Sequence, residues 1–139
     1  MPPTPKSPRS YRNAVFSVVC PFGNTIILTE RTWLGHTTPR HSDQDLAGKV
    51  EHVQAAVQDP DHARRSTDKN HGQDTCIYER VVTGTDSVMR VPVIFDSPAY
   101  EQGGQTGRVM TVYILEPGAR GGQVGEIFWT ADRLKGEEK

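Results

Sequence analysis

The sequence predicts an α+β domain, in which an N-terminal helical segment packs on a four- to five-stranded antiparallel meander. Two observations carry this prediction. A single helical apolar period lies before residue 60, and four later segments are rich in the apolar residues of β-strands. The order of short strands, one helix and then four strands is typical of a helix on one face of an antiparallel sheet.

The first thirty residues predict a flexible arm followed by a hairpin. Residues 1–12 hold four prolines and three basic residues without an apolar period, which is the composition of a flexible arm. Residues 14–20 and 25–29 are apolar and strand-like, and PFGN between them predicts a turn. We therefore expect one α+β domain over residues 13–134, followed by a charged tail at 135–139.

The helix is predicted after residue 42, where the apolar period becomes helical. Ser42 is a candidate N-cap, with an acidic residue three positions later. The segment DPD at 59–61 predicts the helix end. Four apolar residues at positions i, i+4, i+7 and i+11 share one face of this helix: Leu46, Val50, Val53 and Val57.

Four strands are predicted beyond the helix, at 75–83, 88–96, 108–116 and 124–132. Pro92 suggests that the second of them is an edge strand or carries a bulge. The third has apolar residues at both alternating sets of positions, which predicts a central strand. Gly-rich linkers at 97–107 and 117–123 separate the last three strands.

Composition and charge exclude several classes of function. The chain has 139 residues and a net charge of −1, whereas proteins that coat nucleic acid by charge alone are usually strongly basic. A local basic site remains compatible with five cations that lie within forty residues: Arg31, Arg40, Arg64, Arg65 and Lys69. No apolar run is long enough to span a bilayer, and residues 1–12 lack the apolar region of a secretory signal.

The two cysteines indicate the compartment. Cys20 and Cys76 lie in apolar, strand-like runs, so we expect free, buried thiols in place of a disulfide. This usage favours a reducing, cytoplasmic setting.

Two imidazoles and a guanidinium precede the predicted helix. His36, Arg40 and His41 lie just before its N-terminus, where free backbone N–H groups and the helix dipole favour anions. An arginine can hold a phosphate by two hydrogen bonds, and histidines can transfer protons near neutral pH. These groups suit metal-free cleavage of RNA, in which one group deprotonates the ribose 2′-hydroxyl and another protonates the leaving oxygen. A structural or solvated loop is the alternative.

Other kinds of site have less support. The histidines and nearby acids fit no zinc-binding spacing, and no Gly-rich phosphate loop joins a strand to a helix, so neither a metal nor a cofactor is predicted. His62 is expected in a loop. In the predicted sheet, Tyr78, Arg80 and Thr130 are candidates whose alternative roles are a core aromatic, a surface cation and an ordinary β-former.

Several phrases in order resemble the phage-associated branch of the barnase–EndoU–colicin–RelE-like nuclease superfamily. In that branch a strand ends in LTEERW, an H…RHPE phrase leads into a helix that ends in NPD, and YYR and TA phrases follow. The matching residues here are TERTW at 29–33, His36 with Arg40-His41, DPD at 59–61, YER at 78–80 and TA at 130–131. The resemblance covers about residues 24–132. Ser42 and Asp43 depart from the proline and glutamate usual after Arg-His.

The resemblance implies a helix on a four-stranded antiparallel sheet and a metal-independent RNase-like site on the open sheet face. By position it implies that His36 and His41 are general acid and base, and that Arg40 binds phosphate. It also implies that Arg80 supports the transition state and that Thr130 binds phosphate or ribose. Arg31, Arg64 and Tyr78 are the predicted substrate-binding residues.

Two functions follow as expectations. The first is a toxin-like endoribonuclease that cleaves RNA by 2′-hydroxyl attack and is held in check by a neutralising protein partner. The second is a non-catalytic relative that binds RNA or a protein.

Overall fold

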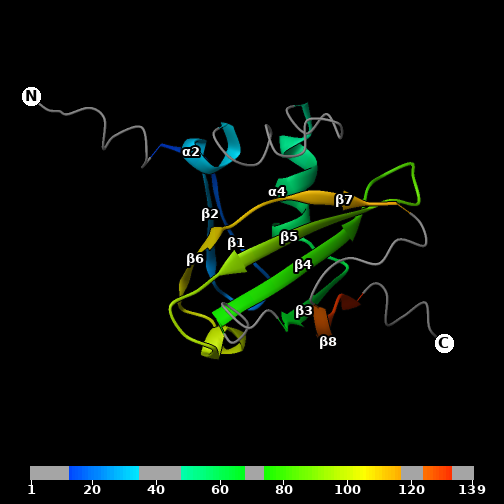
Figure 1. Ribbon diagram of the computed structural model, residues 1–139. Helices are drawn as coiled ribbons and strands as arrows, with labels where there is room; N and C mark the ends of the chain where they lie inside the picture. The colour runs from blue at the N-terminus through cyan, green and yellow to red at the C-terminus, as the bar shows by residue number, and fades with distance from the viewer. Residues whose placement is uncertain (1–12, 35–47, 68–73, 117–123, 133–139) are drawn as a thin grey trace, which may run out of the picture.

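The computed structural model describes residues 13–34, 48–67, 74–116 and 124–132, which form one curled sheet around a short helix (Figure 1). The helix, α4, packs against β1, β4 and β5. The helical elements are α2 (Glu30–Thr32), α4 (Val50–Gln58) and the 3₁₀ turn η5 (Ala99–Gln102). The strands are β1 (Ala14–Val19), β2 (Thr25–Thr29), β3 (His62–Ser66), β4 (Thr75–Val81), β5 (Val88–Ile94), β6 (Thr106–Val109), β7 (Tyr113–Leu115) and β8 (Val124–Thr130).

The predicted fold class, an N-terminal helix on a four- to five-stranded antiparallel meander, is wrong. The sheet has eight strands in the order β1-β2-β6-β5-β4-β3-β8, with β7 paired to β5, and β2 pairs with β6 in parallel. In the described part of the chain, strands far outweigh helices, and there are only two short α-helices. The prediction missed β3 because its sequence, HARRS, lacks an apolar alternation. It missed the parallel pairing because a pairing between distant segments leaves no local pattern.

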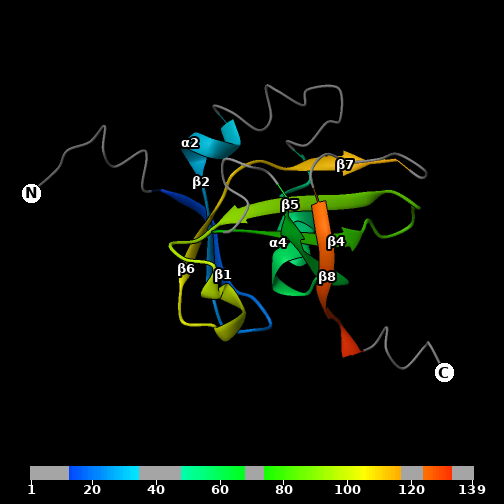
Figure 2. The ribbon, with the colours of Figure 1, turned by 60° about the horizontal axis from the view of Figure 1, so that its bottom comes forward.

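The predicted hairpin at the start of the domain is confirmed. β1 and β2 pair antiparallel, and Gly23 takes a positive φ of 94° in the turn between them. The turn packs back onto distant strands, because the Phe22 ring stacks on Tyr78 at 5.8 Å and meets Phe128 at 5.6 Å. These contacts close the curl, with β1, β2 and β6 on one side of the molecule and β3 and β8 on the other (Figures 1 and 2).

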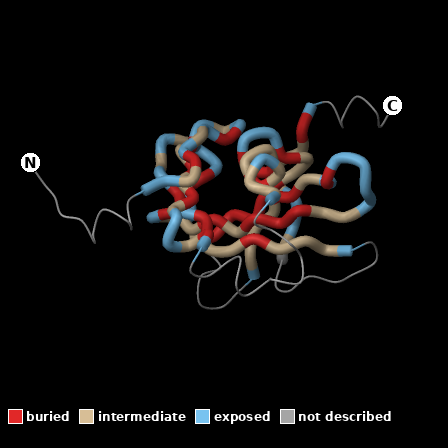
Figure 3. The backbone as a smooth tube through the Cα atoms, turned by 90° about the horizontal axis from the view of Figure 1, so that it is seen from above, coloured by how far each residue is buried: buried red, intermediate tan, exposed pale blue. Residues whose placement is uncertain are grey.

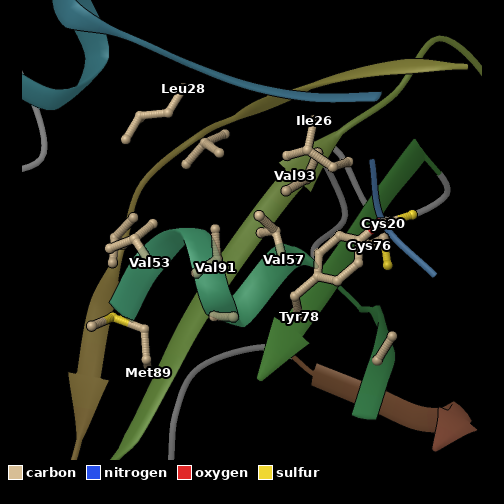
Figure 4. Close-up of a cluster of buried hydrophobic side chains, with 14 of the residues drawn as sticks. Cys20, Ile26, Leu28, Val53, Val57, Cys76, Tyr78, Met89, Val91 and Val93 are labelled. Atoms are coloured by element: carbon tan, nitrogen blue, oxygen red, sulfur yellow. The ribbon is translucent and has the colours of Figure 1, made fainter. Parts of the chain in front are cut away.

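The helix is shorter than predicted at its start. α4 begins at Val50 with Lys49 as N-cap and ends at Gln58, next to the predicted stop at 59–61. The predicted cap Ser42 and the first apolar position, Leu46, lie outside the described residues. The buried face of α4 fills the inside of the curl, where Val53 and Val57 point toward Tyr78, Met89 and Val91 on the sheet (Figure 4).

The later strands agree with prediction in place but differ in pairing. β5 lies inside the sheet, so Pro92 is not on an edge. Residues 108–116, expected to be one central strand, are divided between β6 and β7, and Pro92 lies opposite the interruption, where its carbonyl accepts a hydrogen bond from Met110 N. A proline is tolerated there because the regular ladder is already broken.

Strand registers define the two faces of the sheet. The helix side carries the apolar residues, among them Ala63, Tyr78 and Val91, which are fully buried. The buried stretches accordingly run through the middle of the molecule, with the exposed ones on its outer turns (Figure 3). The opposite face carries the alternating residues of the same strands, several of which are charged. In the described ranges, no helix has the length and apolar character to cross a membrane.

Candidate functional site: a polar row across five strands

Five polar side chains lie in register on the sheet face opposite α4. Residues that are directly opposite in an antiparallel ladder share a face, and neighbouring strands lie about 4.8 Å apart. The row therefore crosses five strands and is roughly 19 Å long. In order across β8, β3, β4, β5 and β7, its members are Thr130, His62, Glu79, Arg90 and Tyr113, which we call the polar row.

Glu79 is the centre of this row and accepts three hydrogen bonds. Its Oε1 accepts from His62 Nε2 and, at 2.8 Å, from Arg64 Nε. Its Oε2 accepts from Arg90 Nε at 2.6 Å. Arg64 lies two residues beyond His62 on β3, so β-strand alternation brings it to the same face. The carboxylate on β4 thus joins one imidazole and one guanidinium from β3 and a second guanidinium from β5.

These contacts keep Glu79 ionised. Burial by itself would raise its pKa, but the hydrogen bonds from His62 and Arg64, together with the positive charge of Arg90, outweigh that effect. The net result lowers the pKa of Glu79 to about 2. A carboxylate with so low a pKa is a weak base, so its chemical part is to position its neighbours.

Glu79, His62, Arg64 and Arg90, which we call the Glu79 cluster, differ in how far their side chains are exposed. The Glu79 and Arg90 side chains are 3% and 6% exposed, whereas His62 and Arg64 are 24% and 28% exposed. Solvent and ligands therefore meet the imidazole and the Arg64 guanidinium. When His62 Nε2 carries the proton that it donates to Glu79, the lone pair of Nδ1 can accept another.

Further contacts fix the two arginines. Arg64 Nη1 also donates to the carbonyl of Gly125 on β8, at 3.3 Å. The guanidinium carbon of Arg90 lies 5.8 Å from the centre of the Tyr113 ring, which is within the range of a cation–π contact. The two arginines are therefore held from opposite sides of Glu79.

The structure separates the residues predicted from the sequence. His36, Arg40 and His41 lie outside the described residues. Arg64 and Thr130 lie on the face of the polar row, while Arg31 is exposed on α2.

Two predicted residues lie elsewhere. Tyr78 is fully buried in the core, which leaves it no surface on which to contact a substrate. Arg80 is on the helix side of the sheet, where its Nη1 donates to the carbonyl and carboxylate of Asp59.

Sequence reasoning missed three members of the cluster, namely His62, Glu79 and Arg90. A signal for two of them was present, since Arg90 is the single charge of the apolar strand β5 and Glu79 lies in the largely apolar strand β4. A buried charge needs a partner, so two such strands predict an ion pair. Within the described ranges, no group of three histidine, cysteine or acidic side chains could hold a metal ion.

Comparisons with protein-family models, with curated proteins and with solved structures found no match to this chain.

Proposed function

We propose that the protein is an endoribonuclease that needs no metal ion and cleaves RNA by attack of the ribose 2′-hydroxyl at the polar row. The observation that carries the proposal is the Glu79 carboxylate, which holds a partly exposed imidazole and a partly exposed guanidinium side by side on one sheet face. Those two groups can supply proton transfer and phosphate binding.

Each residue has a role that follows from its contacts. His62 Nδ1 takes the proton of the 2′-hydroxyl, and Glu79 fixes the ring through Nε2. Arg64 stabilises the negative charge that develops on the phosphorane oxygens. Arg90 is buried and touches Glu79, so it is a positioning residue. The 2′-oxygen forms a bond to phosphorus as the bond to the 5′-oxygen breaks, which leaves a 2′,3′-cyclic phosphate.

The leaving 5′-oxygen requires a proton from a second group. His36 and His41, predicted from the sequence as acid and base, remain the candidates for this donor. Arg40 beside them remains a predicted phosphate ligand. A protein with this activity would act on RNA in the cytoplasm and would be toxic without a neutralising partner protein.

A non-catalytic module that binds RNA or a protein is the second candidate. Two exposed apolar residues on the face of the polar row favour it, namely Val81 and Ile127, which are 45% and 44% exposed. Such residues suit a surface that docks a partner. This module would keep the ion pairs of Glu79 as a structural feature and would leave RNA intact.

The test is cleavage of labelled RNA in the presence of EDTA by the wild type, His62→Gln, Arg64→Gln and a control, Arg108→Gln. Arg108 is an exposed arginine of β6, outside the polar row. We expect wild-type cleavage that survives EDTA and falls at least ~100-fold in His62→Gln and Arg64→Gln, but by less than about twofold in the control.

The same assay separates the two candidates. A folded wild type that binds the RNA without cutting it would overturn the endoribonuclease in favour of the binding module. Equal losses of cleavage in all three variants would show that cleavage depends on the positive charge of the surface in general and not on the polar row.

A further inference from the structure

A small cavity lies beside Arg80, between α4 and the end of β4. Its volume is about 60 Å³. A water molecule needs roughly 10–15 Å³ by this measure, so the cavity has room for about five atoms of that size. Its lining residues are His52 and Ala55 of α4, Arg80 and Val81 of β4, Val82 and Thr83 after that strand, and Met89 of β5.

The cavity is separate from the polar row. β-strand alternation places Arg80 and Glu79 on opposite faces of β4, and Arg80 pairs with Met89, which is buried on the helix side. The Arg80 guanidinium makes its contacts with Asp59, whereas the Glu79 carboxylate makes its contacts with β3 and β5. A ligand in this cavity would therefore use groups that the proposed nuclease chemistry does not.

The polar side chains among the lining residues carry hydrogen-bond donors suited to an oxyanion. Arg80 supplies a guanidinium that is 27% exposed, His52 an imidazole and Thr83 a hydroxyl. A guanidinium has five N–H donors, and both contacts with Asp59 use Nη1 alone. The Asp59 carboxylate, 3.3 Å from Nη1 and 62% exposed, is the negative charge at Arg80 that an anion would have to compete with. A second carboxylate, that of Asp61, accepts from the backbone N of the lining residue Val81 at 2.8 Å.

We propose that this cavity is a binding site for a single phosphate group. Inorganic phosphate, with five bonded heavy atoms, fits within this space, and its oxygens can accept from guanidinium, imidazole and hydroxyl donors. The group can be free phosphate or a backbone phosphate of RNA that flanks the cleavage site. The second source rests on the proposed function, whereas the first does not.

The first experiment titrates the full chain with inorganic phosphate at constant ionic strength and follows the His52 and Arg80 side-chain signals by NMR. We expect saturable shifts, at least ~10-fold weaker binding in Arg80→Gln, and binding about three- to tenfold tighter in Asp59→Asn, because that change removes the competing carboxylate. Glu51→Gln, the same loss of charge on an exposed residue of α4, should leave the affinity unchanged.

The outcomes decide the proposal without any nuclease assay. Shifts that do not saturate, equal tightening by Asp59→Asn and Glu51→Gln, or acetate that binds as well as phosphate would overturn it. Arg80→Gln also removes a contact to the C-cap of α4, so Asp59→Asn is the variant that tests the site by a gain of binding.

A second experiment distinguishes the two sources of phosphate. If the RNA backbone fills the site, Arg80→Gln raises KM for an oligonucleotide several-fold and leaves kcat unchanged. If free phosphate fills it, KM stays the same. A wild type that cleaves no RNA would remove the RNA backbone as the source, and the proposal for free phosphate would still be decided by the titration.

Discussion

The Glu79 carboxylate and the Arg90 guanidinium share a 2.6 Å hydrogen bond although their side chains are only 3% and 6% exposed. Their strands, β4 and β5, place them directly opposite each other on the face away from α4. Two charges can be buried together in this way because each neutralises the other. The Glu79 carboxylate of this pair also accepts hydrogen bonds from the two partly exposed groups, His62 and Arg64.

Glu79→Gln should destabilise the fold because it removes the negative charge that faces the buried Arg90 guanidinium. We expect a loss of about 3 kcal/mol in the free energy of unfolding, measured by chemical denaturation. Glu126→Gln is the control, since Glu126 is 74% exposed and lies 3.5 Å from Arg65, and it should cost less than about 0.5 kcal/mol. Equal losses of stability in the two variants would contradict the claim that the buried Glu79 ion pair stabilises the fold.

The lowered pKa of Glu79 predicts that the free energy of unfolding falls in acid. The pKa of Glu79 is lowered from 4.5 to about 2 on folding, so the stability that it contributes is fully present above about pH 4.5. That contribution, roughly 3 kcal/mol, is lost as the pH falls toward 2. Denaturation curves recorded between about pH 6 and pH 2 should show a steeper decline for the wild type than for Glu79→Gln. Parallel declines would refute this linkage.

The polar row shows what the sequence can predict about the site. Arg64 and Thr130 were predicted because basic residues and a motif drew attention to them. His62 was expected in a loop, since the sequence of β3, HARRS, is mostly basic and lacks an apolar alternation. The row itself is made by the register of five strands, and register depends on contacts between distant segments that no local pattern records.

Tyr78→Phe should leave the protein as stable as the wild type or raise its stability by about 1 kcal/mol. Within the described residues, the buried Tyr78 hydroxyl lies beside the thiols of Cys20 and Cys76, which are weak hydrogen-bond partners, so its removal takes away a poorly satisfied polar group. Tyr100→Phe is the matched control, because the Tyr100 hydroxyl donates to the carbonyl of Thr75 and accepts from Arg65. Thermal unfolding should show a loss in the control alone, and a large loss in Tyr78→Phe would indicate a strong partner for that hydroxyl.

Gly107→Ala tests the packing of β6 against Val93 and Phe95, at the end of β5. A Cβ at Gly107 would lie 2.5 Å from Cε1 of Phe95 and 2.6 Å from Cγ1 of Val93, and both neighbours are buried. We expect a cost of about 1–3 kcal/mol from overpacking, measured by denaturation. Gly48→Ala, where a Cβ meets nothing within 4 Å, should be close to neutral. Unchanged stability in Gly107→Ala would argue against this packing.

The fold was predictable where it depends on local pattern. The hairpin of β1 and β2, the end of α4 and the places of β4, β5 and β8 follow from apolar periods and turn residues. The number of strands and their order do not, because the β2–β6 pairing joins Thr25 to Thr106 and the curl is closed by contacts of Phe22 with distant strands. Such contacts bring together residues that share no sequence signal.

The most direct test of the central claim uses an oligodeoxynucleotide that contains a single ribonucleotide, in the presence of EDTA. The wild type should cut only after the ribonucleotide and leave a 2′,3′-cyclic phosphate, identified by mass spectrometry, and His62→Gln should lose at least ~100-fold of that rate. Cleavage of an all-DNA strand at the same rate, or a folded wild type that leaves the ribonucleotide intact, would contradict a 2′-hydroxyl reaction at the polar row.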